Sequence, residues 1–163
     1  MKKLMLFGMF FSMMGLVAYA QDDAVTDEEL AKFANVEVMT SNYVDAKTEE
    51  LRNMILNNEN IDGGARYNEI KAAWGDEAKM AEANITDAEK AAYQAVQDFQ
   101  DSLQESVKEY KTELIMDDTI LGAGTYNKVN GAIKEDPALK AKLDAMIDAQ
   151  KAKEAAEKAE DGK

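Results

Sequence analysis

Residues 25–36, VTDEELAKFANV, and residues 85–96, ITDAEKAAYQAV, are two versions of one segment, set 60 positions apart in a chain of 163 residues. Aromatic and turn-forming positions coincide along with the alanines, which chance similarity between helix-rich sequences would not produce. After one deletion, YNEIKAAW from Tyr67 matches YNKVNGAI from Tyr126. We therefore interpret the chain as a tandem duplication of a unit of about sixty residues.

Each copy predicts a long helix followed by a short one. The long helix opens on Thr26 or Thr86, with a glutamate three residues later. This is the capping box, in which hydroxyl and carboxylate satisfy the first free amides of a helix. Apolar residues then recur every three to four positions, as one face of a helix requires. The breakers NNENIDGG and DDTILGAG end the long helices at about Asn57 and Asp117.

Two helical hairpins, at residues 25–84 and 85–147, can bury their apolar faces against each other. The chain is therefore predicted to be all-α, a four-helix bundle built from two tandem helical-hairpin repeats. In the second repeat Asp136 and Pro137 restart a helix, as N-cap and first helical residue. Residues 148–163 are charged and lack an apolar stripe, which predicts an extra C-terminal tail, helical or disordered, that frays into solvent.

The first twenty residues, MKKLMLFGMFFSMMGLVAYA, have a basic start, a short apolar run and an Ala-x-Ala end. This is the pattern of a cleavable secretory signal peptide. We expect residues 1–20 to be removed after Ala20, which makes the protein exported, and periplasmic or extracellular. Since no second apolar stretch follows, no membrane span is expected in the mature chain.

The mature chain is strongly acidic. Removing the two lysines of the signal from 19 Lys and Arg, against 32 Asp and Glu, leaves a net charge of −15. Such a chain lacks the cations that replace phosphate counterions, so nucleic acid is excluded as a main partner. Anionic lipid is excluded for the same reason, and a cationic partner, or plain solubility, fits this composition better. The partner itself is expected to be an unidentified envelope protein or, by self-association, a second copy of the chain.

The chain has no cysteine and no histidine. Their absence excludes a Cys/His zinc site, a Ser-His-Asp triad and a thiolate nucleophile. Carboxylates remain, but most fall on solvated helix faces or at caps, where nothing would raise their pKa. We therefore expect no catalytic residue and no cofactor, so the protein is predicted not to be an enzyme. A carboxylate-based hydrolase is kept as a third alternative.

One loop approaches the calcium-binding pattern. In NENIDGGARYNE, the residues Asn58, Asn60 and Asp62 hold positions one, three and five, Gly63 holds six and Glu69 holds twelve. Asparagine at position one lacks the usual carboxylate, and the matching segment of repeat two ends on lysine. These departures favour a glycine turn between helices, and the metal site stays an alternative.

Aromatic residues at helical spacing favour core packing over a ligand cavity. Trp74 is the one tryptophan and has no aromatic counterpart in the second repeat. Together with Tyr67 and Tyr126, the tyrosines that open the two matching segments, it is the candidate for a pocket or a partner contact.

Three stretches resemble a known family: TDEELAKFA from Thr26, the Tyr-x-x-Ile/Val pattern at Tyr67 and Tyr126, and DPALKAKL from Asp136. They are similar to small exported bacterial proteins that contain the domain of unknown function numbered 4168. The resemblance covers nearly all of residues 25–147, as two copies where one is usual. Repeat one departs at its end, where GDEAKMAEA replaces DPALKAKL. The family implies export and an all-helical fold, and it lends no catalytic residue.

These observations together predict an exported, non-enzymatic helical bundle that works through protein–protein contact in the cell envelope. The alternative is a helical protein that binds a small ligand in the space between helices, or calcium at the Asn58 loop.

Overall fold

The computed structural model describes residues 24–161, and within this range it is all-helical and contains no strand. The all-α prediction is therefore confirmed. Six helices follow one another in the order α1 (Asp27–Leu56), α2 (Gly63–Ala73), α3 (Glu77–Glu82), α4 (Asp87–Met116), α5 (Ala123–Glu135) and α6 (Pro137–Asp161). The predicted signal peptide at residues 1–20 lies outside the described range. None of these six helices combines the length and the apolar character needed to cross a bilayer.

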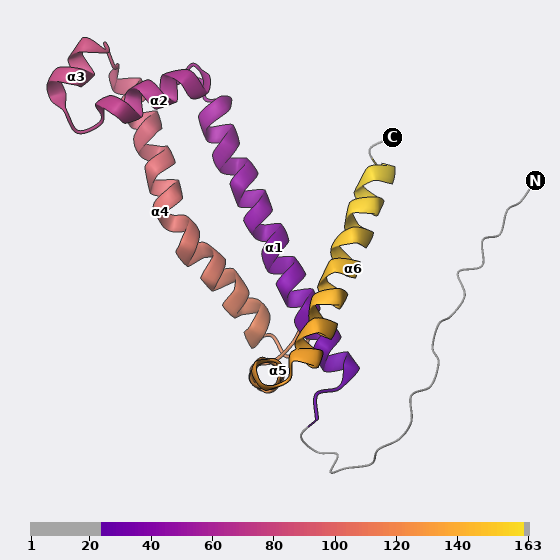
Figure 1. The fold of residues 1–163 in the computed structure, drawn as a ribbon. Helices are drawn as coiled ribbons and strands as arrows, with labels where there is room; N and C mark the ends of the chain where they lie inside the picture. The colour runs from indigo at the N-terminus through magenta and orange to yellow at the C-terminus, as the bar shows by residue number, and fades with distance from the viewer. Residues whose placement is uncertain (1–23, 162–163) are drawn as a thin grey trace, which may run out of the picture.

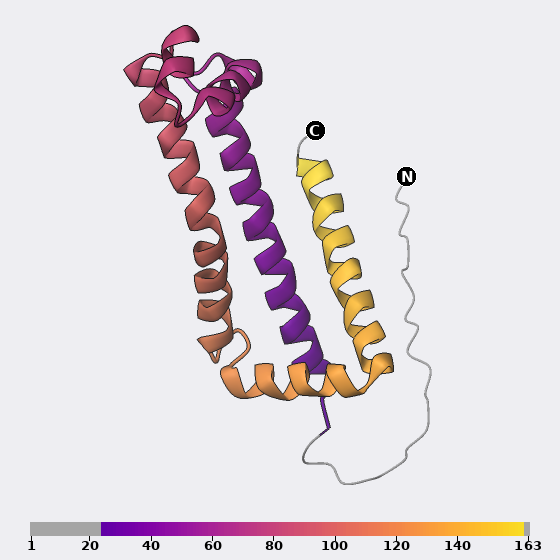
Figure 2. The same cartoon turned by 60° about the vertical axis from the view of Figure 1, so that its left-hand side comes forward.

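The two long helices α1 and α4 have 30 residues each and form an antiparallel hairpin (Figures 1 and 2). Both begin with the predicted capping box. Thr26 Oγ1 accepts from the Glu29 amide at 3.2 Å, and the Glu29 carboxylate accepts from the Thr26 amide at 2.8 Å. Thr86 and Glu89 repeat these bonds at 3.2 and 2.7 Å. The C-caps are Asn57 and Asp117, as the breakers predict.

The short helices do not run alongside the long ones as a four-helix bundle would require. Helix α5 crosses one end of the hairpin, and α2 closes the other end (Figures 1 and 2). The reason is length, because helices of 11 and 13 residues cover about 16–20 Å, against about 45 Å for the 30-residue helices. The predicted single bundle therefore differs from the observed arrangement of a long hairpin that is closed at both ends.

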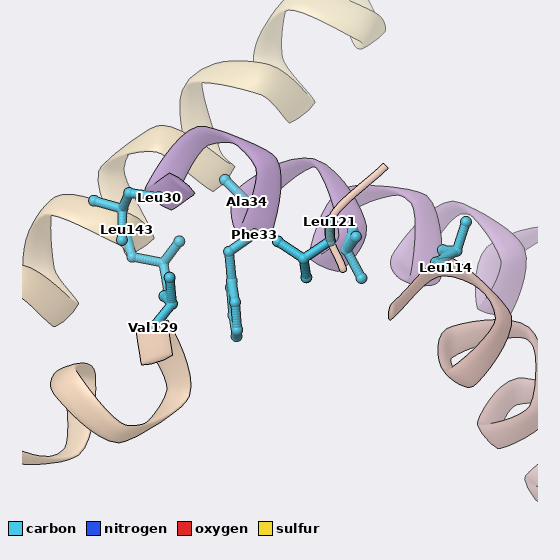
Figure 3. Close-up of a cluster of buried hydrophobic side chains, with 8 residues drawn as sticks. Leu30, Phe33, Ala34, Leu114, Leu121, Val129 and Leu143 are labelled. Carbon is cyan, nitrogen blue, oxygen red and sulfur yellow. The ribbon is translucent and has the colours of Figure 1, made fainter. Parts of the chain in front are cut away.

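Buried apolar residues form two separate clusters, one at each end of the hairpin. The α5 cluster joins the start of α1 to the end of α4, to α5 and to α6 (Figure 3). Its buried members are Leu30, Phe33, Ala34, Val36, Leu114, Leu121, Val129 and Leu143. The ring of Phe33 stacks on Tyr126 at 5.4 Å between centroids, with 8° between the ring planes.

The α2 cluster joins the start of α4 to α2 and to the end of α1. Its buried members are Ile61, Tyr67, Ile70, Ala73, Ile85, Tyr93 and Val96. Tyr93 is 2% exposed, and Tyr67 and Trp74 lie against its ring at centroid distances of 5.2 and 4.5 Å. Each end of the hairpin thus has its own aromatic core.

The C-terminal segment does not fray at residue 148 but continues α6 to Asp161. Asp136 caps this helix by accepting from the amides of Ala138 and Leu139, as predicted. Helix α6 runs in the same direction as α1 but crosses it obliquely, so that the two helices diverge towards the end of α6 (Figures 1 and 2). Further along α6, Glu154 accepts from Asn42 at 2.7 Å, which ties the predicted tail to α1. The helical alternative for the tail is therefore the correct one.

Candidate functional site

The turn between α1 and α2 forms the wall of a concavity of about 570 Å³ at the α2 end of the hairpin. Its lining is mainly polar and comes from four places: the last residue of α1, the turn itself, the start of α2, and the first turn of α4. The lining residues are Leu56, Asn58, Glu59, Asn60, Ile61, Asp62, Gly63, Arg66 and Glu89. Most residues of the predicted calcium loop therefore lie at one surface.

The turn does not have the form of a twelve-residue calcium loop. Helix α2 begins at Gly63, so the second half of the predicted loop is helical. The Asn58 side chain accepts from the Asn60 amide at 2.9 Å and donates to the Met54 carbonyl at 3.0 Å. Glu69 accepts from Arg66 at 2.6 Å. In this geometry the glycine turn ends one helix and starts the next, as the structural interpretation predicts.

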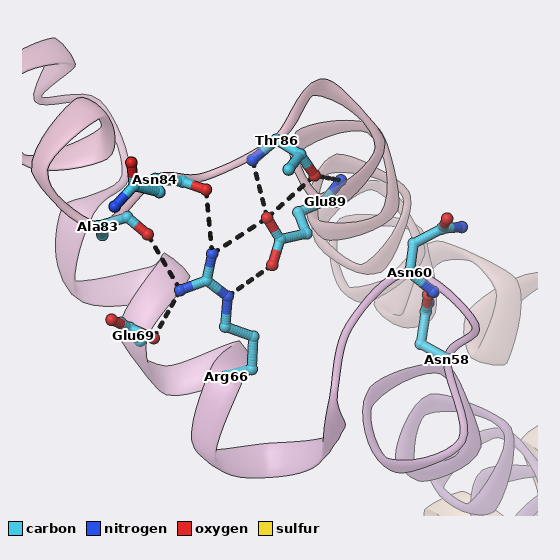
Figure 4. A network of polar contacts seen from close by, with 8 residues as sticks. All are labelled: Asn58, Asn60, Arg66, Glu69, Ala83, Asn84, Thr86 and Glu89. Carbon is cyan, nitrogen blue, oxygen red and sulfur yellow. Dashed lines mark hydrogen bonds and ion pairs between the residues drawn. The ribbon is translucent and has the colours of Figure 1, made fainter.

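Arg66 is the centre of a polar network beside the concavity (Figure 4). Its Nε and Nη2 donate to the two carboxylate oxygens of Glu89 at 2.5 and 3.1 Å. Its Nη1 donates to Glu69 and to the Ala83 carbonyl, and Nη2 reaches the Asn84 carbonyl at 3.4 Å. The guanidinium therefore binds α2, the α3–α4 connection and α4 together, and the bidentate pair fixes its orientation.

Glu89 is a structural carboxylate rather than an acid–base catalyst. The pKa of Glu89 is lowered from 4.5 to about 2, mainly by the hydrogen bonds from Arg66; burial opposes this shift, and the bonds from Thr86 contribute a smaller lowering. The group is therefore ionised at neutral pH and cannot donate a proton. Both oxygens already accept hydrogen bonds, so neither is free to act as a base.

The three aromatic candidates do not converge on one site. Tyr67 and Trp74 meet at Tyr93 in the α2 cluster, whereas Tyr126 lies at the opposite end of the hairpin. Tyr67 is buried, with its Oη accepting from Gln97 at 3.3 Å. These contacts make the rings part of the two cores.

The Arg66–Glu89 pair is the feature that sequence reasoning missed. Two signals could have indicated it: Arg66 is one of only two arginines, and Glu89 is the capping-box glutamate of the second repeat. Glu29, the capping-box glutamate of α1, also binds a cation, Lys128 of α5, at 2.9 Å. Each capping box thus carries an ion pair to the short helix that packs on it.

No protein-family model, curated protein or solved structure matches this chain.

Proposed function

We propose that this chain is an exported, non-enzymatic helical protein that acts through protein–protein contact in the cell envelope. Its export rests on the signal-like residues 1–20, with cleavage after Ala20 and a periplasmic or extracellular destination. The non-enzymatic assignment is supported by the chemistry available, since the most perturbed carboxylate, Glu89, is ionised and fully engaged.

The observation that carries the proposal is a half-buried aromatic strip midway along the hairpin, between the two clusters. Tyr43 stacks on Tyr110 at 4.3 Å, and the Lys47 ammonium lies 5.4 Å from the Phe99 ring centroid. None of these side chains is fully buried, and the neighbouring Val44 is 39% exposed. Aromatic rings with one polar edge are enriched where proteins bind each other.

The strip is open because the middle of the molecule is only one helix thick. Helices α4, α1 and α6 lie in a row (Figure 2), so the two broad faces of this layer have no covering helix within residues 24–161. A contact surface flanked by acidic side chains would suit a partner that offers cationic groups around an apolar centre.

Site-specific photo-cross-linking in the native cell tests this role. A photoreactive phenylalanine analogue at Val44 is expected to give a discrete cross-linked product with an envelope protein. The same analogue at Lys153, which is 77% exposed on α6, serves as the control and should give none. Equal products at both positions, or none at Val44, would count against the strip as a contact surface.

We also propose that the fold arose from duplication of one helical unit, of the kind that resembles the domain of unknown function numbered 4168. The support is that positions matched in sequence occupy matched places in the two clusters. The pairs are Val25 and Ile85, Phe33 and Tyr93, Val36 and Val96, Ile55 and Ile115, Ile61 and Leu121, Tyr67 and Tyr126, and Ile70 and Val129. Asp76 and Asp136, the N-cap residues that begin α3 and α6, form a further pair.

A second candidate function is binding of a small polar ligand, and the 570 Å³ concavity at the α1–α2 turn is the observation that favours it. The exposed carboxylates of Glu59 and Asp62, beside the amide of Asn60, would suit a ligand with amino or hydroxyl groups. Thermal-shift screening of amines and sugars against the wild type and Asn60→Ala tests it. A ligand that stabilises the wild type alone would support this function.

A further inference from the structure

Each apolar cluster is built from both halves of the chain. In the α2 cluster, α2 of the first repeat packs on the start of α4, which belongs to the second. In the α5 cluster, α5 of the second repeat packs on the start of α1, which belongs to the first. The ion pairs Arg66–Glu89 and Lys128–Glu29 also join opposite repeats. Neither half therefore completes a core from its own residues.

The two halves are joined by one tight turn, from Ala83 to Thr86. Asn84 in this turn has φ of 49°, and it is the only non-glycine residue with positive φ among residues 24–161. The Asn84 amide donates to the Ala81 carbonyl at 3.1 Å, and the Ile85 amide donates to Met80 at 3.0 Å. These two bonds define a Schellman motif, which requires its left-handed residue and is best served by glycine or asparagine.

We propose that a second copy of this chain is a binding partner, and that two copies pair by exchanging their repeats about the turn at Asn84. In the exchanged dimer, the first repeat of one copy packs against the second repeat of the other. Both clusters and both inter-repeat ion pairs then form between chains, with the same residues that form them within one chain. Exchange of identical elements is a low-cost route to a dimer, because it needs no new interface.

The turn decides between the closed monomer and the exchanged dimer. The closed turn requires Asn84 to keep its left-handed conformation. In an exchanged chain the segment from Ala83 to Thr86 would be extended, and Asn84 would no longer need a positive φ. Arg66 opposes release, since its guanidinium donates to the Ala83 and Asn84 carbonyls and also to Glu89 on the far side of the turn. Arg66 therefore stabilises the closed turn, in addition to the two backbone hydrogen bonds of the Schellman motif.

Charge also affects the exchange. Each mature copy carries a net charge of −15, so two copies repel each other at low ionic strength. Added salt screens this repulsion over distances longer than about 8–10 Å and should therefore favour the dimer. High salt will also weaken the ion pair between Arg66 and the exposed carboxylate of Glu69.

This inference rests on the protein-contact role proposed above, because it names a second copy of the chain as one partner in that role. The exchange and the contact surface at the aromatic strip can nevertheless be refuted separately. A chain that never exchanges but still cross-links through Val44 loses only the second copy as partner. A chain that exchanges without any product at Val44 loses only the contact surface of the strip.

The first experiment compares Asn84→Val with Asn84→Gly in the full mature chain. Each protein is unfolded in urea, refolded at 0.5 M salt over a range of protein concentrations, and sized by light scattering after gel filtration. Because a β-branched residue disfavours positive φ, Asn84→Val should lower the dimer dissociation constant about tenfold or more relative to the wild type. Asn84→Gly keeps the turn and should leave the dimer dissociation constant close to that of the wild type. If Asn84→Val does not regain its helical signal, Asn84→Ala replaces it.

The second experiment asks whether any dimer is exchanged. Equal amounts of ¹⁴N and ¹⁵N protein are unfolded, mixed and refolded, and the dimer is treated with a zero-length carbodiimide. The reagent joins Lys128 to Glu29, whose charged atoms lie 2.9 Å apart. Exchange predicts that about half of the cross-linked peptide pairs combine the two isotopes. A dimer with pairs of a single isotope, or the absence of any dimer from the wild type and both turn variants, would overturn the proposal.

Discussion

Replacing Glu89 with glutamine removes one charge from a half-buried network and leaves its shape unchanged. Glutamine can still accept from the Thr86 amide, so the capping box survives while the bidentate pair with Arg66 is lost. The equivalent change, Glu29→Gln, is the matched control. Glu29 occupies the same position in the first repeat, but its side chain is 23% exposed, against 12% for Glu89, and its cation is a single lysine.

The expected cost follows from the pKa of Glu89. Arg66 is the main cause of its fall from 4.5 to about 2, and each unit corresponds to about 1.4 kcal/mol. Allowing for partial solvent screening, Glu89→Gln should lower the free energy of unfolding by about 2–3 kcal/mol at pH 7. Glu29→Gln should cost about 0.5–1 kcal/mol, as a more exposed ion pair does.

The pH dependence has a definite sign. Because the folded pKa of Glu89 is lowered, its contribution is complete above about pH 5 and disappears as the pH falls through 4.5 towards 2. The difference in stability between wild type and Glu89→Gln should therefore shrink over that window.

Urea titrations between pH 3 and pH 7, followed by circular dichroism and by the fluorescence of Trp74, measure this difference. A Glu89→Gln cost no larger than that of Glu29→Gln, or a difference that does not change with pH, would refute the reasoning.

Three further predictions concern other parts of the molecule. Val38→Ala should cost about 2 kcal/mol in the urea titration, because Val38 is 1% exposed, whereas Asp98→Ala at the matched position of α4 should change stability by less than about 0.5 kcal/mol. Tyr67→Ala should cost about 3 kcal/mol and shift the Trp74 emission, and Tyr126→Ala, which removes a half-buried ring, should cost less and leave that emission unchanged. Calcium at millimolar concentration should not raise the melting temperature, since Glu69 is held by Arg66 inside α2; a rise that Glu69→Gln abolishes would restore the calcium alternative.

Local structure could be predicted from the sequence because its signals act within a few residues. The capping boxes at Thr26 and Thr86, the C-caps at Asn57 and Asp117, and the start of α6 after Asp136 all match the sequence pattern. Each depends on hydrogen bonds between residues two to four positions apart. No knowledge of the tertiary fold is needed to find them.

The arrangement of the helices could not be predicted in the same way. Apolar periodicity shows which face of a helix is buried, but it does not specify which partner covers it. Tyr67 and Ile70 of α2 pack on the start of α4 and on the end of α1, and their spacing specifies neither contact. The pairing of Arg66 with Glu89, 23 residues away, depends on the contact between α2 and α4. The sequence pattern therefore did not predict this ion pair.

A difference between α1 and α4 explains why the two long helices are covered unequally. On α1, Leu30, Ala34 and Val38 form a buried stripe at intervals of four residues, and Asn42 continues it to the contact with Glu154 on α6. At the matched positions, α4 has Lys90, Gln94 and Asp98, and the last two are exposed and bonded to each other at 2.7 Å.

A helix laid on this stripe of α4 would bury those polar groups without partners, whereas the same helix on α1 removes apolar surface from water. The first repeat accordingly ends in the six-residue α3, and the second extends into the 25-residue α6. The polar residues Lys90, Gln94 and Asp98 on α4 are therefore consistent with the absence of a long helix on that face. Helix α6 therefore covers α1 from Leu30 to Asn42, while Gln94 and Asp98 on the matching face of α4 remain exposed.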